Sequence, residues 1–379
     1  MSSAIWITGP PASGKSILAR AVAGQLRAAG DPHVVLELDE IRRVVTPSPT
    51  YTEIERDVVY RALVYMAAAL TAAGAPVIVD ATAHRRAWRD LARRRIARFA
   101  EVQLICPLDV CREREARRTG GNAPRGIYAR AGAPGSVVPG VDVPYEPAPK
   151  PELTIDTSRD APDVAVRRIV ALLRALAAPR AARAGGRPPG WAMWVTGLPG
   201  SGKTTLSRKA AETLAARSTP VRVLEFAEFR DALLDDGSES DATREIVHRA
   251  LAYTARLLTQ VGVPVIVDAT APRRAWRALA RQLITHFAEV QLVCPSGLCG
   301  ERERAVRWRL GAHASAAPVE RPARAPELSL DYEASLSPEL VLHTDHDVAE
   351  NLTALLRLTE RLQAAATAAS YTPRPGVSA

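Results

Sequence analysis

The chain carries the same pattern twice, and this duplication constrains its fold more than any other feature of the sequence. An offset of 188 residues separates Lys15 from Lys203 and Asp80 from Asp268, and the two copies align without a gap for over a hundred residues. The segments PVIVDATA, RRAWR and FAEVQL are identical in both copies. Each copy is long enough to bury its own core, so the pattern indicates a duplicated domain rather than a solenoid.

Composition suggests where the copies begin and end. We expect a first domain at 1–177, a linker at 178–190, a second domain at 191–363 and a disordered tail at 364–379. The linker is rich in Pro, Gly and Arg and lacks apolar periodicity. The apolar stretch at 62–79 is interrupted by Gly-Ala-Pro at 74–76, so we predict no membrane-spanning segment and no membrane partner.

Short apolar runs alternate with longer helical patterns within each copy. In the first copy IWIT, VVLEL, PVIVD, EVQLIC and ELTID read as strands, and we expect helices at 15–29, 53–73, 84–98, 108–118 and 162–177. This alternation predicts an α/β fold, with a mostly parallel sheet covered by helices on both faces. Ligands are then expected beyond the carboxyl ends of the strands.

A phosphate-loop motif follows the first strand of each copy and opens a helix. The motif reads GPPASGKS at 9–16 and GLPGSGKT at 197–204, which predicts two tandem P-loop NTPase-type domains that bind ATP and Mg²⁺. The expected nucleotide-binding residues are Gly9, Ser13, Gly14, Lys15, Ser16, Gly197, Gly200, Ser201, Gly202, Lys203, Thr204 and Thr205, with Ser16 and Thr204 also binding Mg²⁺. Ala12 replaces the glycine found at Gly200, and its Cβ would crowd the nucleotide if the backbone φ is positive there.

The net charge of +9 comes almost entirely from arginine, and two of the four lysines lie in the phosphate loops. We interpret the basic stretch at 85–98 as the solvated face of a helix rather than a nucleic-acid-binding stripe. The four cysteines form the same C-x4-C pair twice, which does not favour a zinc site. Without a charged leader before the first strand, we expect a cytoplasmic protein.

The segment LELDEIRR at 36–43 returns as LEFAEFRD at 224–231, and Ala227 stands at the place of Asp39. We interpret Asp39 as a carboxylate at the end of the second strand that orients an attacking hydroxyl, with Lys15 as its catalytic partner. A helix N-cap is the alternative role for Asp39. Glu225 and Glu228 are the neighbouring carboxylates of the second copy.

From the phosphate loop through LELDEIRR, VIVDATAHRRAWR and CREREARR to RGIYARAG and GVDVPYEPAPKPELTIDT, the first copy resembles the adenylylsulfate (APS) kinases over residues 4–177. The resemblance implies transfer of the γ-phosphate of ATP to the 3′-hydroxyl of APS, giving PAPS and ADP, a step of sulfate assimilation. It implies that Asp39 faces that hydroxyl and that Arg114, or Arg302 in the second copy, lies beside the nucleotide. The acceptor-binding residues implied are Arg42, Arg56, Ile127, Tyr128 and Tyr145.

The sequence departs from the family pattern around the acceptor. Val59 replaces an asparagine, Ala83 replaces a serine, Leu38 replaces a glycine, and no Lys-Asn-Phe segment occurs between residues 132 and 140. A kinase of the polynucleotide-kinase type, acting on another hydroxyl, is therefore a second hypothesis. A third is that the second copy only binds nucleotide, because residues 314–320 replace the expected lid segment, GIYARAG at 126–132 of the first copy, and the aspartate is absent. Pairing of the two copies, or a homo-oligomer, is then expected.

Overall fold

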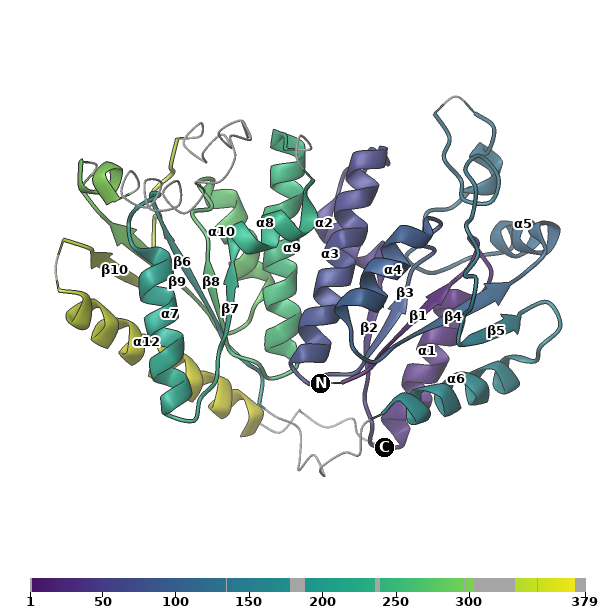
Figure 1. Ribbon diagram of the computed structural model, residues 1–379, viewed down its shortest axis with the longest axis horizontal. Helices are drawn as coiled ribbons and strands as arrows, with labels where there is room; N and C mark the ends of the chain where they lie inside the picture. Colours follow the sequence, from purple (N-terminus) through teal and green to yellow (C-terminus); the bar gives the residue numbers. More distant parts are fainter. Residues whose placement is uncertain are drawn as a thin grey trace, which may run out of the picture. The chain divides into compact units, whose positions relative to one another are not determined.

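The computed structural model describes residues 2–133, 135–177, 188–235, 239–295, 297–302, 331–345 and 347–371. The chain divides into two compact units, each built around one sheet (Figure 1). This confirms the α/β architecture of two tandem P-loop kinase-like domains. Most of the expected linker, at 178–187, and the expected lid replacement at 314–320 lie outside the described residues.

The first sheet consists of five parallel strands in the order β2-β3-β1-β4-β5. Their bounds are β1 (Ala4–Thr8), β2 (Val34–Glu37), β3 (Val77–Asp80), β4 (Phe99–Ile105) and β5 (Leu153–Asp156). The central strands are almost continuously apolar because helices cover both of their faces. In the register, Ile7 of β1 pairs with Asp80 of β3, so the carboxyl ends of both strands meet where the phosphate loop begins.

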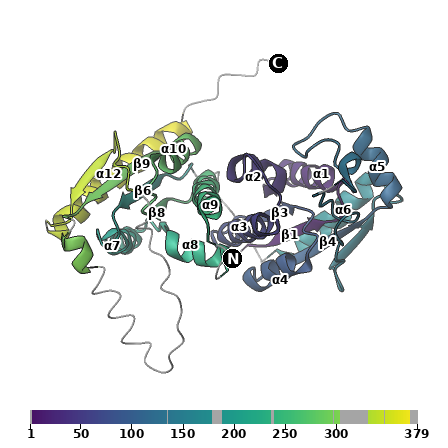
Figure 2. The same cartoon turned by 90° about the horizontal axis from the view of Figure 1, so that it is seen from above.

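Helices cover the two faces of this sheet (Figure 2). On one face α1 (Lys15–Ala28) and α6 (Pro162–Leu176) pack against each other and against the strands. On the other lie α3 (Glu53–Ala72) and α4 (Arg86–Arg95). The short helices α2 (Leu38–Val45) and α5 (Leu108–Ala116) follow β2 and β4. The 3-10 helix η1 (Tyr128–Arg130) lies within the expected lid segment.

The second unit repeats this arrangement. Its sheet has the order β7-β8-β6-β9-β10, from β6 (Ala192–Gly197), β7 (Arg222–Glu225), β8 (Val265–Asp268), β9 (Phe287–Val293) and β10 (Leu340–His343). The helices are α7 (Lys203–Ala216), α8 (Phe226–Leu233), α9 (Asp241–Gln260), α10 (Arg274–Leu283) and α12 (Val348–Tyr371).

Helix α12 corrects one expectation about the C-terminal tail. The sequence predicted disorder from Ala364, but the helix continues to Tyr371. Alanine has the highest helix propensity, and Ala366 is fully buried, so both local preference and packing extend the helix. Residues 372–379 lie outside the described residues. Of the helices in the described part of the chain, none combines the length and apolar character needed to cross a bilayer.

The basic stretch at 85–98 is not simply a solvated face, as the sequence indicated, because Arg89 is fully buried. Its Nε lies 2.6 Å from a carboxylate oxygen of Glu101, and its guanidinium also donates to the main-chain oxygen of Ala83. Arg277 of the second copy makes the equivalent contacts. The buried arginine therefore fixes the loop that follows β3, which carries part of the site described below.

Candidate active site

The loop between β1 and α1 has the geometry expected of a phosphate-binding loop. Gly14 precedes the helix in the left-handed region, with φ 98°, and no side chain caps the first turn of α1. The Lys15 ammonium donates to the main-chain oxygens of Gly9 at 3.1 Å and Pro10 at 2.8 Å. Burial lowers the pKa of Lys15. The loop thus presents its helix N-terminus and a buried lysine on the same side of the sheet.

Two of the expected nucleotide-binding residues, Gly9 and Ser13, do not line the cavity above the phosphate loop. A Cβ on Gly9, which has φ 154°, would lie 2.8 Å from the Ser13 hydroxyl, so the close approach requires glycine. The Ser13 hydroxyl is buried and has no hydrogen-bond partner within the described residues. Gly14, Lys15 and Ser16 line the cavity above the loop, whereas Gly9 and Ser13 support it from below.

We call this space the phosphate-loop cavity, and its volume is about 590 Å³. Residues of the loop, of α5 and of the segment after β5 line it, among them Arg114, Arg117, Arg118 and Thr157. The Arg114 guanidinium donates to the Thr157 hydroxyl at 3.1 Å and to its main-chain oxygen at 2.6 Å. The structure therefore places Arg114 at the wall of the phosphate-loop cavity, next to the segment that follows β5.

Asp80 is a carboxylate in the phosphate-loop cavity that the sequence analysis did not single out. It ends β3, is 4% exposed, and accepts a hydrogen bond from the Ser16 hydroxyl. Its Oδ2 is buried without a hydrogen-bond partner among the described residues. Burial, opposed by the charge of Lys15, raises the pKa of Asp80 to about 6. The sequence feature that could have identified Asp80 is its position at the end of an apolar strand.

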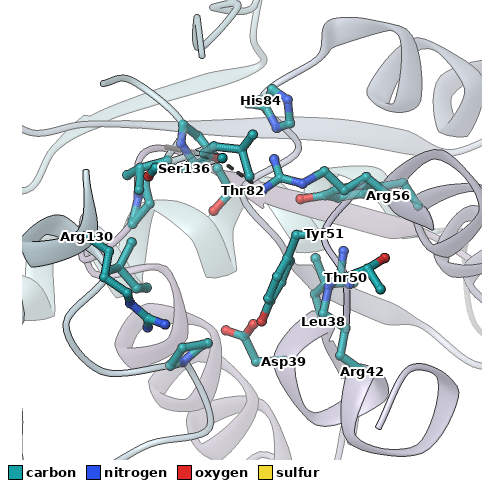
Figure 3. A pocket seen from close by; sticks show the side chains of 18 of the residues that line it. Leu38, Asp39, Arg42, Thr50, Tyr51, Arg56, Thr82, His84, Arg130 and Ser136 are labelled. Atoms are coloured by element: carbon teal, nitrogen blue, oxygen red, sulfur yellow. Dashed lines mark hydrogen bonds between the residues drawn. The ribbon is translucent and has the colours of Figure 1, made fainter. Parts of the chain in front are cut away.

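A second cavity, of about 400 Å³, adjoins the first, and we call it the arginine cavity (Figure 3). Helices α2 and α3, the loop after β3 and the segment at 124–139 enclose it. The polar side chains that line it are Asp39, Arg42, Thr50, Tyr51, Arg56, Tyr60, Thr82, His84, Arg130 and Ser136.

Asp39 lines both cavities and marks the place where they meet. It lies in the first turn of α2 and not at the end of the second strand, as the sequence suggested, because the helix already begins at Leu38. Glu37 occupies the N-cap position, and no side chain caps the helix, so Asp39 does not have the alternative capping role. Burial raises the pKa of Asp39, and the charges of Lys15 and Arg42 oppose this rise.

The two arginines predicted to bind the acceptor both reach the arginine cavity, but their charges are compensated differently. Arg42 donates to the Glu55 carboxylate at 2.9 Å, and both side chains are buried. Arg56 donates to the main-chain oxygen of Val137 at 3.0 Å, while its Nε is buried without a partner. Within the described residues Arg56 forms no ion pair with a carboxylate. The cavity therefore contains a buried positive charge without a carboxylate partner.

Tyr51 is an aromatic side chain of this cavity that the sequence analysis missed. The guanidinium carbons of Arg42 and Arg56 lie 5.2 and 5.8 Å from its ring centroid. Its ring extends across the cavity toward Asp39 (Figure 3). Tyr51 has φ 55°, a conformation unfavourable for a tyrosine, and the adjacent Thr50 is held by hydrogen bonds to Glu55. No sequence pattern predicts a positive φ at a tyrosine.

Three predicted acceptor-binding residues come from the expected lid segment and the segment before β5, namely Ile127, Tyr128 and Tyr145. Only one of them lines a cavity. Ile127 lines both cavities. Tyr128 does not, because it is buried and its hydroxyl donates to the main-chain oxygen of Pro11 at 2.8 Å. Tyr145 also lines neither cavity, since its hydroxyl lies 2.9 Å from that of Thr8 at the end of β1. Both tyrosines therefore lie outside the lining of the two cavities, and their hydroxyls contact the phosphate loop and the end of β1.

Two of the departures from the family pattern do not reach the arginine cavity. Val59 and Ala83 are both fully buried, and neither lines it. Thr82 and His84, on either side of Ala83, do line it, and the loop turns at Ala83, which has φ 43°.

The second copy retains the phosphate end of the site. The Lys203 ammonium donates to the main-chain oxygens of Gly197 and Leu198, both at 3.0 Å. The Thr204 hydroxyl donates to Asp268 at 2.5 Å, which repeats the contact between Ser16 and Asp80. Arg302 donates to the main-chain oxygen of Thr344 at 3.0 Å, as Arg114 does to Thr157. The remaining loop residues, Gly200, Ser201, Gly202 and Thr205, keep the aligned positions.

The second copy differs at the positions that correspond to the arginine cavity of the first. Phe226, at the place of Leu38, stacks on His248 with ring centroids 4.2 Å apart, and His248 stacks on Trp276 at 4.0 Å. Ala227 lies on the exposed side of the first turn of α8. The neighbouring Glu225 forms a two-point ion pair with Arg208.

The two arginines at the acceptor end of the second copy are bound to local carboxylates. Arg230 pairs with Asp231 at 3.1 Å, and Arg244 pairs with Asp241 at 2.9 Å. Neither arginine is therefore left with an uncompensated charge, in contrast to Arg56.

Comparisons with known proteins agree on one family. A model of the family described as adenylylsulphate kinase matches residues 1–156 and 189–343. A probable adenylyl-sulfate kinase of Archaeoglobus fulgidus is 36% identical over 162 residues, which are 42% of this chain and 99% of the relative. An adenylyl-sulfate kinase of a Synechococcus species is 35% identical over 159 residues, 41% of this chain and 86% of the relative.

A solved Mycobacterium tuberculosis APS kinase, in complex with AMPPNP and APS, covers 46% of this chain and 99% of its own at 26% identity and a TM-score of 0.36. The family assignment depends on the sequence matches instead. The family model spans most of both copies, each with its own phosphate loop, and the chain therefore belongs to the adenylylsulfate kinase family.

Proposed function

We propose that the first copy transfers the γ-phosphate of ATP to the 3′-hydroxyl of adenylylsulfate, giving PAPS and ADP. The observation that carries this proposal is the position of Asp39, which lines both the phosphate-loop cavity and the arginine cavity. A phosphoryl donor in the first cavity and a hydroxyl acceptor in the second would meet beside this carboxylate.

The chemical step needs mainly positioning and charge stabilisation. Asp39 would accept the proton of the attacking 3′-hydroxyl as the oxygen of that hydroxyl forms a bond to the γ-phosphorus of ATP. The bond from that phosphorus to the β,γ-bridging oxygen breaks, and ADP leaves. The raised pKa of Asp39 suits a group that takes up a proton during the reaction. Lys15 would stabilise charge on the outer phosphates.

The residues present fit a magnesium ion at the phosphate loop. The Ser16 hydroxyl and the Asp80 carboxylate share a hydrogen bond, and the second carboxylate oxygen of Asp80 is buried without a partner. Hydroxyl and carboxylate oxygens are ligands that Mg²⁺ accepts beside phosphate oxygens. Ser16, supported by Asp80, would hold the ion, and Thr204 with Asp268 would do so in the second copy. When bound, Mg²⁺ would neutralise charge that develops on the phosphates.

The arginine cavity supports an anionic nucleotide as the acceptor. Its volume suits a single nucleotide, and Arg56 supplies a positive charge without a carboxylate partner. Tyr51 adds an aromatic ring to the wall of this cavity, packed against the Arg42 and Arg56 guanidinium groups, where it would contact the nucleotide. Adenylylsulfate is a single nucleotide with an adenine base and an anionic phosphosulfate group, so it matches this cavity in size and charge.

We further propose that the second copy binds nucleotide without transferring phosphate. Its phosphate-loop lysine makes the same contacts as in the first copy, whereas Ala227 stands at the place of the proposed base and the neighbouring Phe226 stacks on His248. In this proposal 1–177 and 191–363 are the two domains, the protein acts in the cytoplasm, and the copies pair with each other or in a homo-oligomer.

ADP release by the full chain, measured by a coupled assay with ATP and Mg²⁺, tests the proposed reaction. We expect release with adenylylsulfate that greatly exceeds release with adenosine nucleotides lacking sulfate or with 5′-hydroxyl oligonucleotides. Faster release with the oligonucleotide would favour an enzyme of the polynucleotide-kinase type instead.

A further inference from the structure

We propose that His84 determines acceptor specificity, because with Arg56 it donates a hydrogen bond to the anionic 5′ group of the acceptor nucleotide. This inference rests on the proposed function of the arginine cavity and adds a residue to it.

His84 is held at the wall of the cavity without a partner for its ring nitrogens. It follows β3, is 3% exposed and lines the cavity. Its ring meets the edge of Trp88, with centroids 5.1 Å apart, which fixes its position. Within the described residues neither ring nitrogen forms a hydrogen bond. A polar group placed this way gains free energy when a ligand supplies its partner.

Arg56 provides a second donor at the same wall. Its Nε is buried and unpartnered among the described residues, and its charge acts on His84. Burial, followed by the charge of Arg56, lowers the pKa of His84 to about 4. The ring is therefore neutral near pH 7, with one N–H donor and one acceptor nitrogen. A guanidinium and a neutral imidazole together suit a group that offers only acceptor oxygens, such as a phosphosulfate.

The place of His84 relative to Asp39 identifies which part of the acceptor it meets. Asp39 and His84 lie on opposite sides of the cavity, with Tyr51 and the Arg56 guanidinium between them (Figure 3). In the proposed reaction the 3′-hydroxyl faces Asp39. The 5′ substituent is attached on the other side of the ribose, so it would extend toward Arg56 and His84.

The second copy supplies a variant that the backbone accepts. Pro272 occupies the position of His84, and the preceding residues have nearly the same conformation, with φ 43° for Ala83 and 40° for Ala271. The His84 amide donates no hydrogen bond to the described main chain. His84→Pro should therefore fold while it removes the donor, and His84→Asn keeps a neutral N–H.

The test compares the unmodified full chain with H84P, H84N and, as a matched control in the second copy, P272H. We would measure kcat and KM for adenylylsulfate, KM for ATP, and inhibition by adenosine, which lacks a 5′ anion. H84P should raise KM for adenylylsulfate about tenfold or more, the size expected for a hydrogen bond to a charged group. H84P should leave kcat, the KM for ATP and the inhibition constant for adenosine within about twofold of the unmodified chain. H84N should have a KM for adenylylsulfate between those of H84P and the unmodified chain. P272H should change none of these constants.

Two results would overturn the role of His84. One is an unchanged KM for adenylylsulfate in H84P, and the other is an equal loss of affinity for adenosine, which would indicate general packing. If the unmodified chain released no ADP with adenylylsulfate, the proposed function would fail, and this inference with it.

Discussion

At the scale of single residues, the proposed site of the first copy is a cluster of buried ionisable side chains. Burial raises the pKa values of Asp39 and Asp80 and lowers those of Lys15 and His84. The protonation state of each of these four side chains therefore depends on a few neighbouring groups rather than on bulk water. The sequence identified Asp39 and Lys15, because both belong to motifs with fixed spacing.

The residues that sequence analysis missed at this scale share a physical reason. Tyr51 and His84 enter the arginine cavity through backbone turns with positive φ, at Tyr51 itself and at Ala83. Non-glycine residues rarely adopt this conformation, so no pattern of residue types predicts it. Glu55 lies in an ordinary helical pattern, and its contact with Arg42 appears only in three dimensions.

Asp39→Asn tests the proposed base. The amide keeps the shape of the side chain but cannot accept the proton of the hydroxyl, so kcat should fall by roughly 10²–10⁴. ATP affinity, measured by calorimetry, should stay nearly unchanged because Arg114 and the phosphate loop are intact. A parallel loss of ATP binding would assign the carboxylate to the nucleotide rather than to the hydroxyl.

The pKa of His84 predicts how stability depends on pH. The pKa is about 4 in the folded chain, against 6.5 for the ordinary group, with Arg56, Arg89 and Glu146 as the charged neighbours. Between these two values the unfolded chain binds more protons, so the free energy of unfolding should decrease as pH falls from about 6.5 to 4. Thermal unfolding of the unmodified chain should therefore show a steeper decline in Tm over this window than the H84N variant does. Equal slopes would contradict the lowered pKa.

At the scale of elements, the strand-loop-helix unit of the phosphate loop was the most predictable part of the fold. The expected strands and helices of the first copy agree with the structure to within a few residues. Boundaries were less predictable where packing decides them. Helix α2 begins early enough to include Asp39, and α12 extends past Ala364 because Ala366 is buried.

The two phosphate loops differ in their tolerance of a side chain. Ala12 has φ 58° and packs against a buried cluster that includes Cys111 and Tyr128. In the second copy Gly200 has φ 77°, and a Cβ there would lie 2.3 Å from the main-chain oxygen of Cys299. The Cβ expected from the sequence to crowd the nucleotide is thus accommodated by packing in the first copy.

Gly200→Ala should therefore destabilise the second copy by about 1–3 kcal/mol, through strain and displacement of the Cys299 backbone. It should also reduce the rise in Tm that ATP produces. Ala12→Gly is the matched control, and its effect should stay within about 1 kcal/mol. Equal stability of Gly200→Ala and the unmodified chain, in denaturant unfolding, would contradict this account.

At the scale of the whole molecule, the duplication combines two phosphate loops of similar geometry with different side chains around them. The sequence predicted this asymmetry from the change of Asp39 to Ala227. It could not predict that Phe226 stacks on His248, or that local carboxylates bind Arg230 and Arg244. These contacts depend on side-chain packing, which spacing alone does not specify.

The most direct test of the central claim compares Lys15→Ala with Lys203→Ala in the full chain, measured as adenylylsulfate-dependent ADP release. The two lysines make matching contacts with their loops, so the substitutions are equivalent in structure. We predict that Lys15→Ala lowers the rate by at least about a hundredfold, because it removes charge stabilisation from the transition state. Lys203→Ala should leave the rate within about threefold. Loss of turnover in Lys203→Ala, with turnover retained in Lys15→Ala, would contradict the assignment of chemistry to the first copy.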